Sequence, residues 1–141
     1  MNVLEIPFVK KVGIEKNNDG SLQLQFDKSV HNHLQSIHAS AQFTLAETAS
    51  GEMLQIAFPE LVGKVVPVLR DSQNKFRKPA LKAITAFPSI SSDAVQKFKE
   101  QLSKKGRASI SVNVEVKGSE GTTASTGVFN WFVQQIDETK T

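Results

Sequence analysis

A run of nearly uncharged residues between positions 37 and 59 predicts a helix that is buried on most of its sides. Only Glu47 and Glu52 carry charge in this run, which holds no lysine or arginine. A helix on a protein surface normally presents a charged face. We therefore expect one central helix over residues 32–54, with a polar beginning at residues 32–36. Its apolar stripes would consist of Phe43, Ala46, Ser50, Met53 and Ala57 on one side and of Leu45, Ala49 and Ile56 on another.

Before this helix, alternating apolar and polar positions predict a β-hairpin. Residues 8–16 alternate loosely and residues 22–27 alternate strictly, which is the period of a strand. Residues 17–20, Asn-Asn-Asp-Gly, predict the turn because these residue types tolerate positive φ. Residues 1–8 would form a short lead-in with some helical character. The inward side chains would be Phe8, Val12 and Ile14 on the first strand and Leu22, Leu24 and Phe26 on the second.

After the helix, strand patterns return at residues 63–70 and 80–87, joined by a polar and basic connection at 71–79. The segment Ser91-Ser92-Asp93 can cap a second helix, and Lys104-Lys105-Gly106 can end it. This helix should lie on the surface, because its apolar residues form one stripe of Val95, Phe98 and Leu102.

The last two strands are predicted most clearly. Residues 108–117 alternate between apolar and polar side chains without exception. Residues 128–133 are apolar on both faces, so this strand should be central in a sheet or lie at an interface. An antiparallel sheet with a helix on one face is an α+β arrangement, which we expect to form a single domain over residues 1–141.

Composition narrows the class of protein. With 141 residues, of which 39% are hydrophobic and 22% charged, the chain can build one real core and is not of the disordered class. It has no cysteine, which excludes a disulfide scaffold, a thiolate zinc site and a cysteine nucleophile. We find no signal peptide and no apolar stretch of about 18 residues, so we expect a cytoplasmic protein without a membrane partner. The net charge of +3 suits an anionic small molecule or a nucleic acid.

The segment from Asn32 to Ser40 reads Asn-His-Leu-Gln-Ser-Ile-His-Ala-Ser, and Glu47 follows nine residues after its last histidine. This pattern resembles the Asn-x-x-Gly-x-x-His-Gly-Gly segment and later acidic residue of acyl-CoA thioesterases of the phenylacetate-degradation type. Residues 46–51 are similar to that family's Ala-Asp-x-Ala-x-Gly, and residues 76–80 and 106–116 resemble strand segments of the same superfamily. The likeness covers about residues 20–135.

The chain departs from that pattern at three positions. Gln35 replaces a glycine, and Ala39-Ser40 replaces Gly-Gly. It is most similar to the uncharacterised thioesterase-like branch of the superfamily. The resemblance implies a hot-dog fold, in which an antiparallel sheet wraps around one long central helix, and hydrolysis of an acyl-CoA or related thioester.

On this interpretation Glu47 is the base or nucleophile, because a carboxylate in a dry site can activate water or attack a thioester. The alternative for Glu47 is an ordinary solvent-facing helix residue. Asn32 and His38 would assist it, although an Asx-turn and a helix cap are the alternatives for these two residues.

The beginning of the helix would supply the oxyanion site. Unpaired backbone N–H groups at Ala39 and Ser40, with Thr44 nearby, could hold a thioester carbonyl and its developing charge. The Cβ atoms of Ala39 and Ser40 narrow this site relative to Gly-Gly. The first alternative function is therefore a non-catalytic protein that binds acyl thioesters. The second is a dehydratase or hydratase that uses His38 with Glu47.

The densest basic group outside the second helix consists of Arg70, Lys75, Arg77 and Lys78. Arginine suits phosphates, so we expect this group to bind the phosphates of coenzyme A; a solvated loop is the alternative. A nucleic-acid site would need aromatic residues among the cations, and only Phe76 is so placed, so we expect no nucleic-acid partner.

We expect no metal, because His31, His33 and His38 have no clear further ligands in the sequence. No cofactor is expected either, since coenzyme A would enter as part of the substrate. In the superfamily that the chain resembles, the pocket usually lies between two protomers. This likeness, together with the two apolar faces of residues 128–133, predicts a homodimer or a dimer of dimers.

Overall fold

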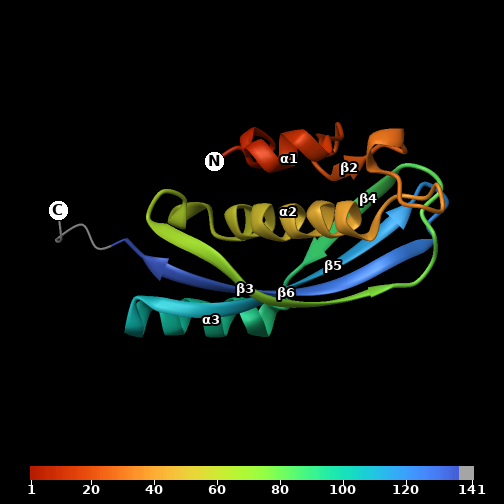
Figure 1. Ribbon diagram of the computed structural model, residues 1–141. Helices are drawn as coiled ribbons and strands as arrows, with labels where there is room; N and C mark the ends of the chain where they lie inside the picture. The colour runs from red at the N-terminus through yellow and green to blue at the C-terminus, as the bar shows by residue number, and fades with distance from the viewer. Residues whose placement is uncertain (137–141) are drawn as a thin grey trace.

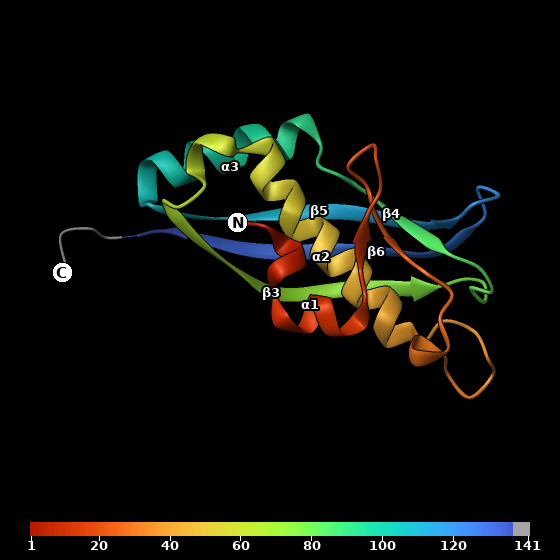
Figure 2. The same cartoon turned by 90° about the horizontal axis from the view of Figure 1, so that it is seen from above.

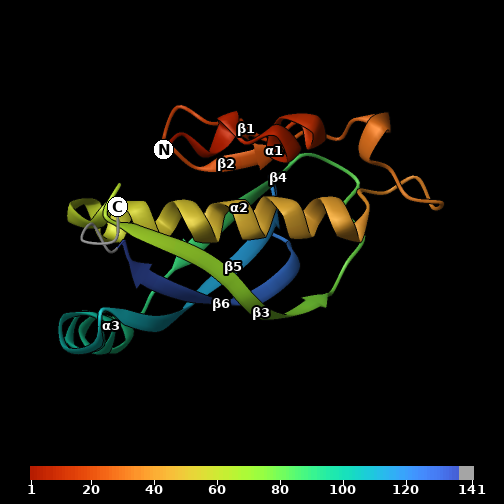
Figure 3. The same cartoon turned by 60° about the vertical axis from the view of Figure 1, so that its left-hand side comes forward.

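The structure, a computed structural model, describes residues 1–136. At its centre, helix α2 (Ala39–Ala57) lies across one face of a six-stranded antiparallel sheet, which curves beneath it (Figures 1 and 3). The strand order is β1-β2-β4-β5-β6-β3, and α2 contacts strands β2 to β6. The expected α+β architecture is confirmed. The strands are β1 (Glu15–Lys16), β2 (Leu22–Leu24), β3 (Val65–Phe76), β4 (Ile84–Ser89), β5 (Arg107–Gly118) and β6 (Thr123–Gln135).

Two further helices flank this unit. Helix α1 (Pro7–Val12) packs on the side of α2 away from the sheet, and α3 (Ser92–Lys105) lies beside β5 near the end of α2 (Figures 1 and 2). Within residues 1–136, no helix is long and apolar enough to cross a membrane. Short 3-10 turns are η1 (Val3–Glu5), η2 (Lys28–Val30) and η3 (Pro59–Leu61).

The core lies between α2 and the inner face of β5 and β6. The inward residues of β5 are buried and its outward residues are exposed or half-buried, as the alternation predicts. Strand β6 lies between β5 and β3, with Phe129, Trp131 and Val133 buried on its inner face. Val128 and Phe132 face outward and are half-buried. The central position expected for residues 128–133 is confirmed.

Helix α3 agrees with its prediction. The Ser91 hydroxyl accepts a hydrogen bond from the Ala94 N–H at 3.1 Å, and Gly106 ends the helix with φ of 72°. Phe98 and Leu102 are buried, and the Phe98 ring lies 4.7 Å from that of Phe58, just after α2. Strand β4 pairs only with residues 113–118 of β5, so α3 flanks the part of β5 that β4 does not reach.

The expected beginning of the central helix is wrong by seven residues, because residues 32–36 form a turn. The Asn32 side-chain oxygen accepts hydrogen bonds from the N–H groups of Leu34 at 2.9 Å and Ser36 at 3.1 Å. These bonds offer the backbone an alternative to the helix. The helix also runs three residues further than expected, to Ala57, and Ile56 points to solvent with 62% of its surface exposed.

The predicted strand at residues 8–16 is also largely wrong. Pro7 at the first helical position and Gly13 at the end, with φ of 93°, delimit α1 instead, and only Glu15–Lys16 form β1. Phe8 is 63% exposed, whereas Val9 is buried. The predicted turn at residues 17–20 and the hairpin from β1 to β2 are confirmed. Phe26 follows β2 and is partly exposed.

Most of the polar connection at residues 71–79 belongs to a strand. Strand β3 continues to Phe76, with a bulge between Leu69 and Asp71, and pairs only with β6. An edge strand can carry polar side chains along its length, which explains why its second half did not show the apolar signal. Strand β4 begins at Ile84, four residues later than expected.

Gln35 is the only described residue other than glycine with a positive φ, at 56°. A side chain in this left-handed region costs roughly 1–2 kcal/mol, while glycine loses roughly 0.5–1 kcal/mol through chain entropy. We therefore expect Gln35→Gly to raise the free energy of unfolding by about 1 kcal/mol or less. Urea titration checks this, with Gln35→Ala as the control that keeps Cβ and gains nothing. A Gln35→Gly protein no more stable than Gln35→Ala would contradict the strain.

Candidate functional site

A largely apolar cavity of about 520 Å³ lies between α1, α2, β3 and β6. Among the residues that the structure describes, Glu47 is the only one with an ionisable side chain that lines this cavity. The inner wall consists of large buried aromatic residues, Phe58, Phe98 and Trp131. Cavities of this size and character accept small organic ligands.

Glu47 lies in the middle of α2, two turns after the helix begins. Burial raises the pKa of its carboxyl above the ordinary value of 4.5, because the charged form loses its hydration. Within residues 1–136, no hydrogen bond or ion pair reaches this carboxylate. Glu52, the other acid of the helix, differs because Lys16 pairs with it at 2.8 Å. Glu47 is therefore a half-buried acid on the wall of an apolar cavity.

Trp131 fixes the helical turn that carries Glu47. Its indole N–H donates a hydrogen bond to the Ser50 hydroxyl at 2.9 Å, and that hydroxyl donates to the Glu47 carbonyl at 2.7 Å. Ser50 is fully buried. A Cβ on Gly51 would lie 3.3 Å from the indole ring, so the sheet approaches the helix closely at this point. No local sequence pattern indicates a site role for Trp131 or Ser50, because the contact joins residues 81 positions apart.

The beginning of α2 is capped by His38. The imidazole Nδ1 accepts a hydrogen bond from the Ser40 N–H at 3.0 Å, and the His38 carbonyl accepts from Ala41 and Gln42. Ala39 is thus left with the one N–H of the first turn that has no acceptor among the described residues. The Thr44 hydroxyl donates to the Ser40 carbonyl at 2.9 Å. Of the two expected oxyanion donors, only Ala39 is available in this arrangement.

Asn32 forms the Asx-turn and His38 forms the helix cap, the two structural roles that were the alternatives to a site role. The Asn32 side chain is used within its own turn, where its amide also donates to the Ser36 hydroxyl at 2.9 Å. Ser40 precedes Glu47 by seven residues, which is about 10 Å along a helix. Glu47 and the helix start of one chain therefore do not meet at a single carbonyl group.

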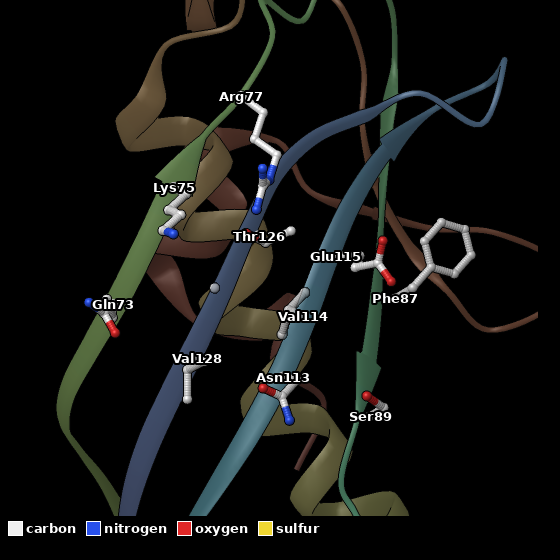
Figure 4. Close-up of a pocket in the computed structure, with 11 residues that line it drawn as sticks. Gln73, Lys75, Arg77, Phe87, Ser89, Asn113, Val114, Glu115, Thr126 and Val128 are labelled. Carbon is white, nitrogen blue, oxygen red and sulfur yellow. The ribbon is translucent and has the colours of Figure 1, made fainter.

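The sheet separates the basic group from Glu47. Lys75 and Arg77 line a second cavity of about 400 Å³ on the outer face, where α2 lies behind the strands (Figure 4). The Arg70 guanidinium stacks over the Phe132 ring at 4.4 Å. Lys78 is exposed and is not among the residues that line either cavity.

The three histidines do not form a metal centre. Residues 1–136 hold no group of three or more ligand-type side chains arranged for a metal ion. His31 lies with its ring 4.3 Å from that of Phe26, and His38 caps α2.

Solved structures share this architecture. A probable thioesterase of unknown function from Pseudomonas aeruginosa, PA5026, has a TM-score of 0.81 at 20% identity over 95% of this chain and 91% of its own. The thioesterase HI1161 from Haemophilus influenzae has 0.75 at 15% identity over 99% and 90%. BH2602 from Bacillus halodurans, solved with CoA, has 0.69 at 26% identity over 89% and 74%. No curated protein matches the chain.

A long helix wrapped by an antiparallel sheet, which these solved structures share, defines a protein of the hot-dog fold. Within that class, the chain belongs to the family described as domain of unknown function DUF4442, whose family model matches residues 5–133.

Substitutions at Gly51 and Trp131 test how closely α2 packs against β6. In an unconstrained helix Gly51→Ala would add about 1 kcal/mol of stability through helix propensity. Here we expect no gain or a loss, because the new Cβ presses on the indole. In a Trp131→Phe background the smaller ring should restore the gain. Urea unfolding of the four proteins measures the coupling. Equal effects of Gly51→Ala in both backgrounds would rule out the close contact as the cause.

Proposed function

We propose that this protein hydrolyses an acyl-CoA or related acyl thioester, with Glu47 as base or nucleophile. The observation that carries the proposal is an unpaired, half-buried carboxylate on the wall of an apolar cavity of about 520 Å³. Such a cavity accommodates an acyl group, and a desolvated carboxylate is a stronger base than one in water. Similarity to structures described as thioesterases, and to one solved with CoA, supports the same class of substrate.

In this mechanism the acyl group enters the cavity and places its carbonyl carbon near Glu47. The carboxylate accepts a proton from water while the water oxygen bonds to that carbon. The oxyanion that forms is stabilised by backbone N–H groups at a helix start, above all that of Ala39. Collapse breaks the carbon–sulfur bond, and the thiolate takes the proton. If Glu47 attacks directly, an anhydride forms first and water then cleaves it.

We propose that the helix start that stabilises the oxyanion belongs to a second protomer. Within one chain, Ser40 and Glu47 are about 10 Å apart along α2. Strand β3 has a free edge, and Val66, Val68 and Phe76 near it are each about half exposed. Pairing of two such edges about a two-fold axis would join the sheets of a homodimer. A dimer of dimers remains compatible with this arrangement.

The basic residues also fit this assembly. Antiparallel pairing of the β3 edges about their middle would bring Lys75 and Arg77 of the partner subunit toward Val65 and Pro67, which line the Glu47 cavity. Coenzyme A phosphates would then bind Lys75 and Arg77, with Arg70 and Lys78 close by. We place this activity in the cytoplasm, as the sequence indicates.

A second candidate is a protein that binds acyl thioesters without turning them over. The cap that His38 places on the Ser40 N–H favours it, since one oxyanion donor is already used. A dehydratase or hydratase is less well supported, because Nδ1 of His38 serves the helix. Release of free CoA from short-chain, aromatic and long-chain acyl-CoAs separates hydrolysis from binding, and a 2-enoyl substrate tests the third function.

Glu47→Gln should lower hydrolysis by about 10²- to 10⁴-fold, because the amide keeps the shape and loses the proton acceptor. Substrate affinity should change little. In the wild type, kcat/KM should rise with pH as Glu47 loses its proton, with a midpoint above 4.5. Steady-state kinetics on the two proteins measure both effects. Unchanged turnover in Glu47→Gln would make Glu47 a structural residue.

The same substitution should also stabilise the fold at neutral pH. Because the pKa of Glu47 is raised on folding, the folded state binds more protons between 4.5 and the raised value, and stability falls as pH rises through that window. Glu47→Gln should remove this loss of folding stability. The variant should therefore be more stable than the wild type at pH values above this window, and the difference in stability should disappear below it.

Mixed dimers test whether one site draws on two protomers. Ala39→Pro removes the available N–H, and proline is tolerated at this first helical position because His38 is already extended, with ψ of 140°. Alone, Ala39→Pro and Glu47→Gln should each be nearly inactive. Co-refolded in equal amounts, they should recover about a quarter of wild-type activity, because each mixed dimer holds one intact site. No recovery in verified mixed dimers would place both groups in one chain.

A further inference from the structure

The outer face of the sheet carries a second cavity, and the proposed hydrolysis assigns a role only to its two cations, Lys75 and Arg77. Most of the side chains that line it belong to β3, β6, β5 and β4 and lie on the face of the sheet away from α2 (Figure 4). The strand register aligns four of them in one row across the sheet: Lys75 opposite Thr126, Thr126 opposite Glu115, and Glu115 opposite Phe87. We call this cavity the outer basin; it has a volume of about 400 Å³.

One end of the outer basin is cationic. Lys75 lies on the edge strand, and the Arg77 N–H donates to the Ala124 carbonyl at 2.8 Å, which fixes the backbone just beyond β3. Figure 4 shows the Arg77 side chain reaching over β6 toward Thr126. Among the described residues, no carboxylate forms an ion pair with Lys75 or Arg77. Two unpaired cations, one of them a guanidinium fork, suit a phosphate group.

The opposite end is aromatic, with an acid and a base beside the ring: Glu115, and Lys117, whose Nζ lies 5.8 Å from the centre of the Phe87 ring. Phe87 exposes 47% of its surface, and Glu115 lies beside it (Figure 4). Lys117 at 3.8 Å and the Thr123 hydroxyl at 3.5 Å both contact Oε2 of Glu115. Its Oε1 has no partner in the part of the chain that the structure describes. An exposed ring can stack on a planar base, and a free carboxylate oxygen can accept a hydrogen bond from an amino group.

The distance between the two ends limits the size of the ligand. Adjacent strands lie about 4.8 Å apart, so Lys75 and Phe87, three spacings apart, are separated by about 14 Å. A nucleoside diphosphate spans a comparable length from its base to its terminal phosphate. The Thr126 hydroxyl and the Asn113 amide line the middle of the basin, where the ribose would lie.

We propose that the outer basin binds an adenosine 5′-diphosphate moiety, with phosphates at Lys75 and Arg77, the base on Phe87, and its amino group at Oε1 of Glu115. Free ADP and the nucleotide half of CoA share this moiety. Only the CoA source rests on the proposed function, through the pairing of protomers described above. Binding of free ADP depends on neither Glu47 nor turnover.

Calorimetric titration of the full chain with ADP at low salt tests the basin. Lys75→Glu with Arg77→Glu should abolish binding, whereas Lys97→Glu with Lys99→Glu on α3, an equal change of charge, should leave at least part of it. Phe87→Leu should weaken binding by roughly tenfold, within the range for loss of base stacking. Circular dichroism confirms that each variant is folded. Equal ADP affinity in the Lys75/Arg77 variant and the wild type would overturn the proposal.

Inosine diphosphate tests the recognition of the base, because it carries an oxygen where ADP carries the amino group. It should bind the wild type several-fold more weakly than ADP, and the difference should disappear in Glu115→Gln. If inorganic phosphate binds as tightly as ADP and Phe87→Leu changes nothing, the basin is a simple anion site. If light scattering shows a higher oligomer that excludes ADP, a second copy of the chain covers the face. Either result overturns the nucleotide assignment.

Two further measurements show whether the ligand is free ADP or the nucleotide of CoA, and separate ADP binding from thioester hydrolysis. Competitive inhibition of acyl-CoA hydrolysis by ADP would identify the basin as the site of the CoA nucleotide, and ADP binding without effect on KM would identify free nucleotide as the ligand. Glu47→Gln should keep wild-type affinity for ADP. A chain that binds ADP but hydrolyses no thioester would remove the proposed function alone, whereas hydrolysis without ADP binding would remove only this inference.

Discussion

The close packing of α2 against the curved sheet is the constraint on which the structure depends. A helix covered from several sides must replace charge with small and apolar side chains, and α2 does so along most of its length. The closest approach lies at Gly51, where the indole of Trp131 occupies the space that a Cβ would need. The hydrogen bond from Trp131 to Ser50 then fixes the rotation of the helix relative to β6. Because packed interiors tolerate little change in volume, this contact determines which side chains of α2 face the cavity.

That rotation gives Glu47 its chemical character. The same burial that excludes lysine and arginine from the helix also leaves Glu47 without an ionic partner, and desolvation raises its pKa. An unpaired acid at such a position lowers stability, and proteins retain such groups mainly where they serve a function. Glu52, one and a half turns further on, shows the alternative outcome, since Lys16 neutralises it.

The sheet divides the chemistry of the molecule between its two faces. The inner face has an apolar cavity with one acid, and the outer face has a polar row that ends in two cations. Lys75 and Arg77 lie near the edge formed by β3, which among the described strands pairs with β6 alone. On the proposed function, a second protomer completes the thioester site at this edge.

Elements with local sequence signals can be predicted from the amino-acid sequence alone. Strict alternation identified β5, the lack of charge identified α2, and Ser91 with Gly106 delimited α3, because each pattern reflects contacts within a few residues. The resemblance around Glu47 located the acid in the same way. Predictions from local patterns are wrong where two patterns compete. The Asn32 side chain stabilises a turn where the pattern predicts the beginning of a helix. Pro7 and Gly13 delimit a helix where a loose alternation predicts a strand.

Contacts between residues far apart in the sequence depend on the packing of the whole chain. Trp131 and Ser50 are far apart in sequence, and nothing in either local pattern indicates their hydrogen bond. The charge of Lys75 and Arg77 predicts that they lie beside the thioester site, but the sheet places them on the face opposite Glu47. Phe87, Glu115 and Lys75 share a row because of strand order and register, which depend on long-range pairing. A local pattern can indicate which face of a strand is buried, but the neighbours of that strand are determined by the packing of the whole chain.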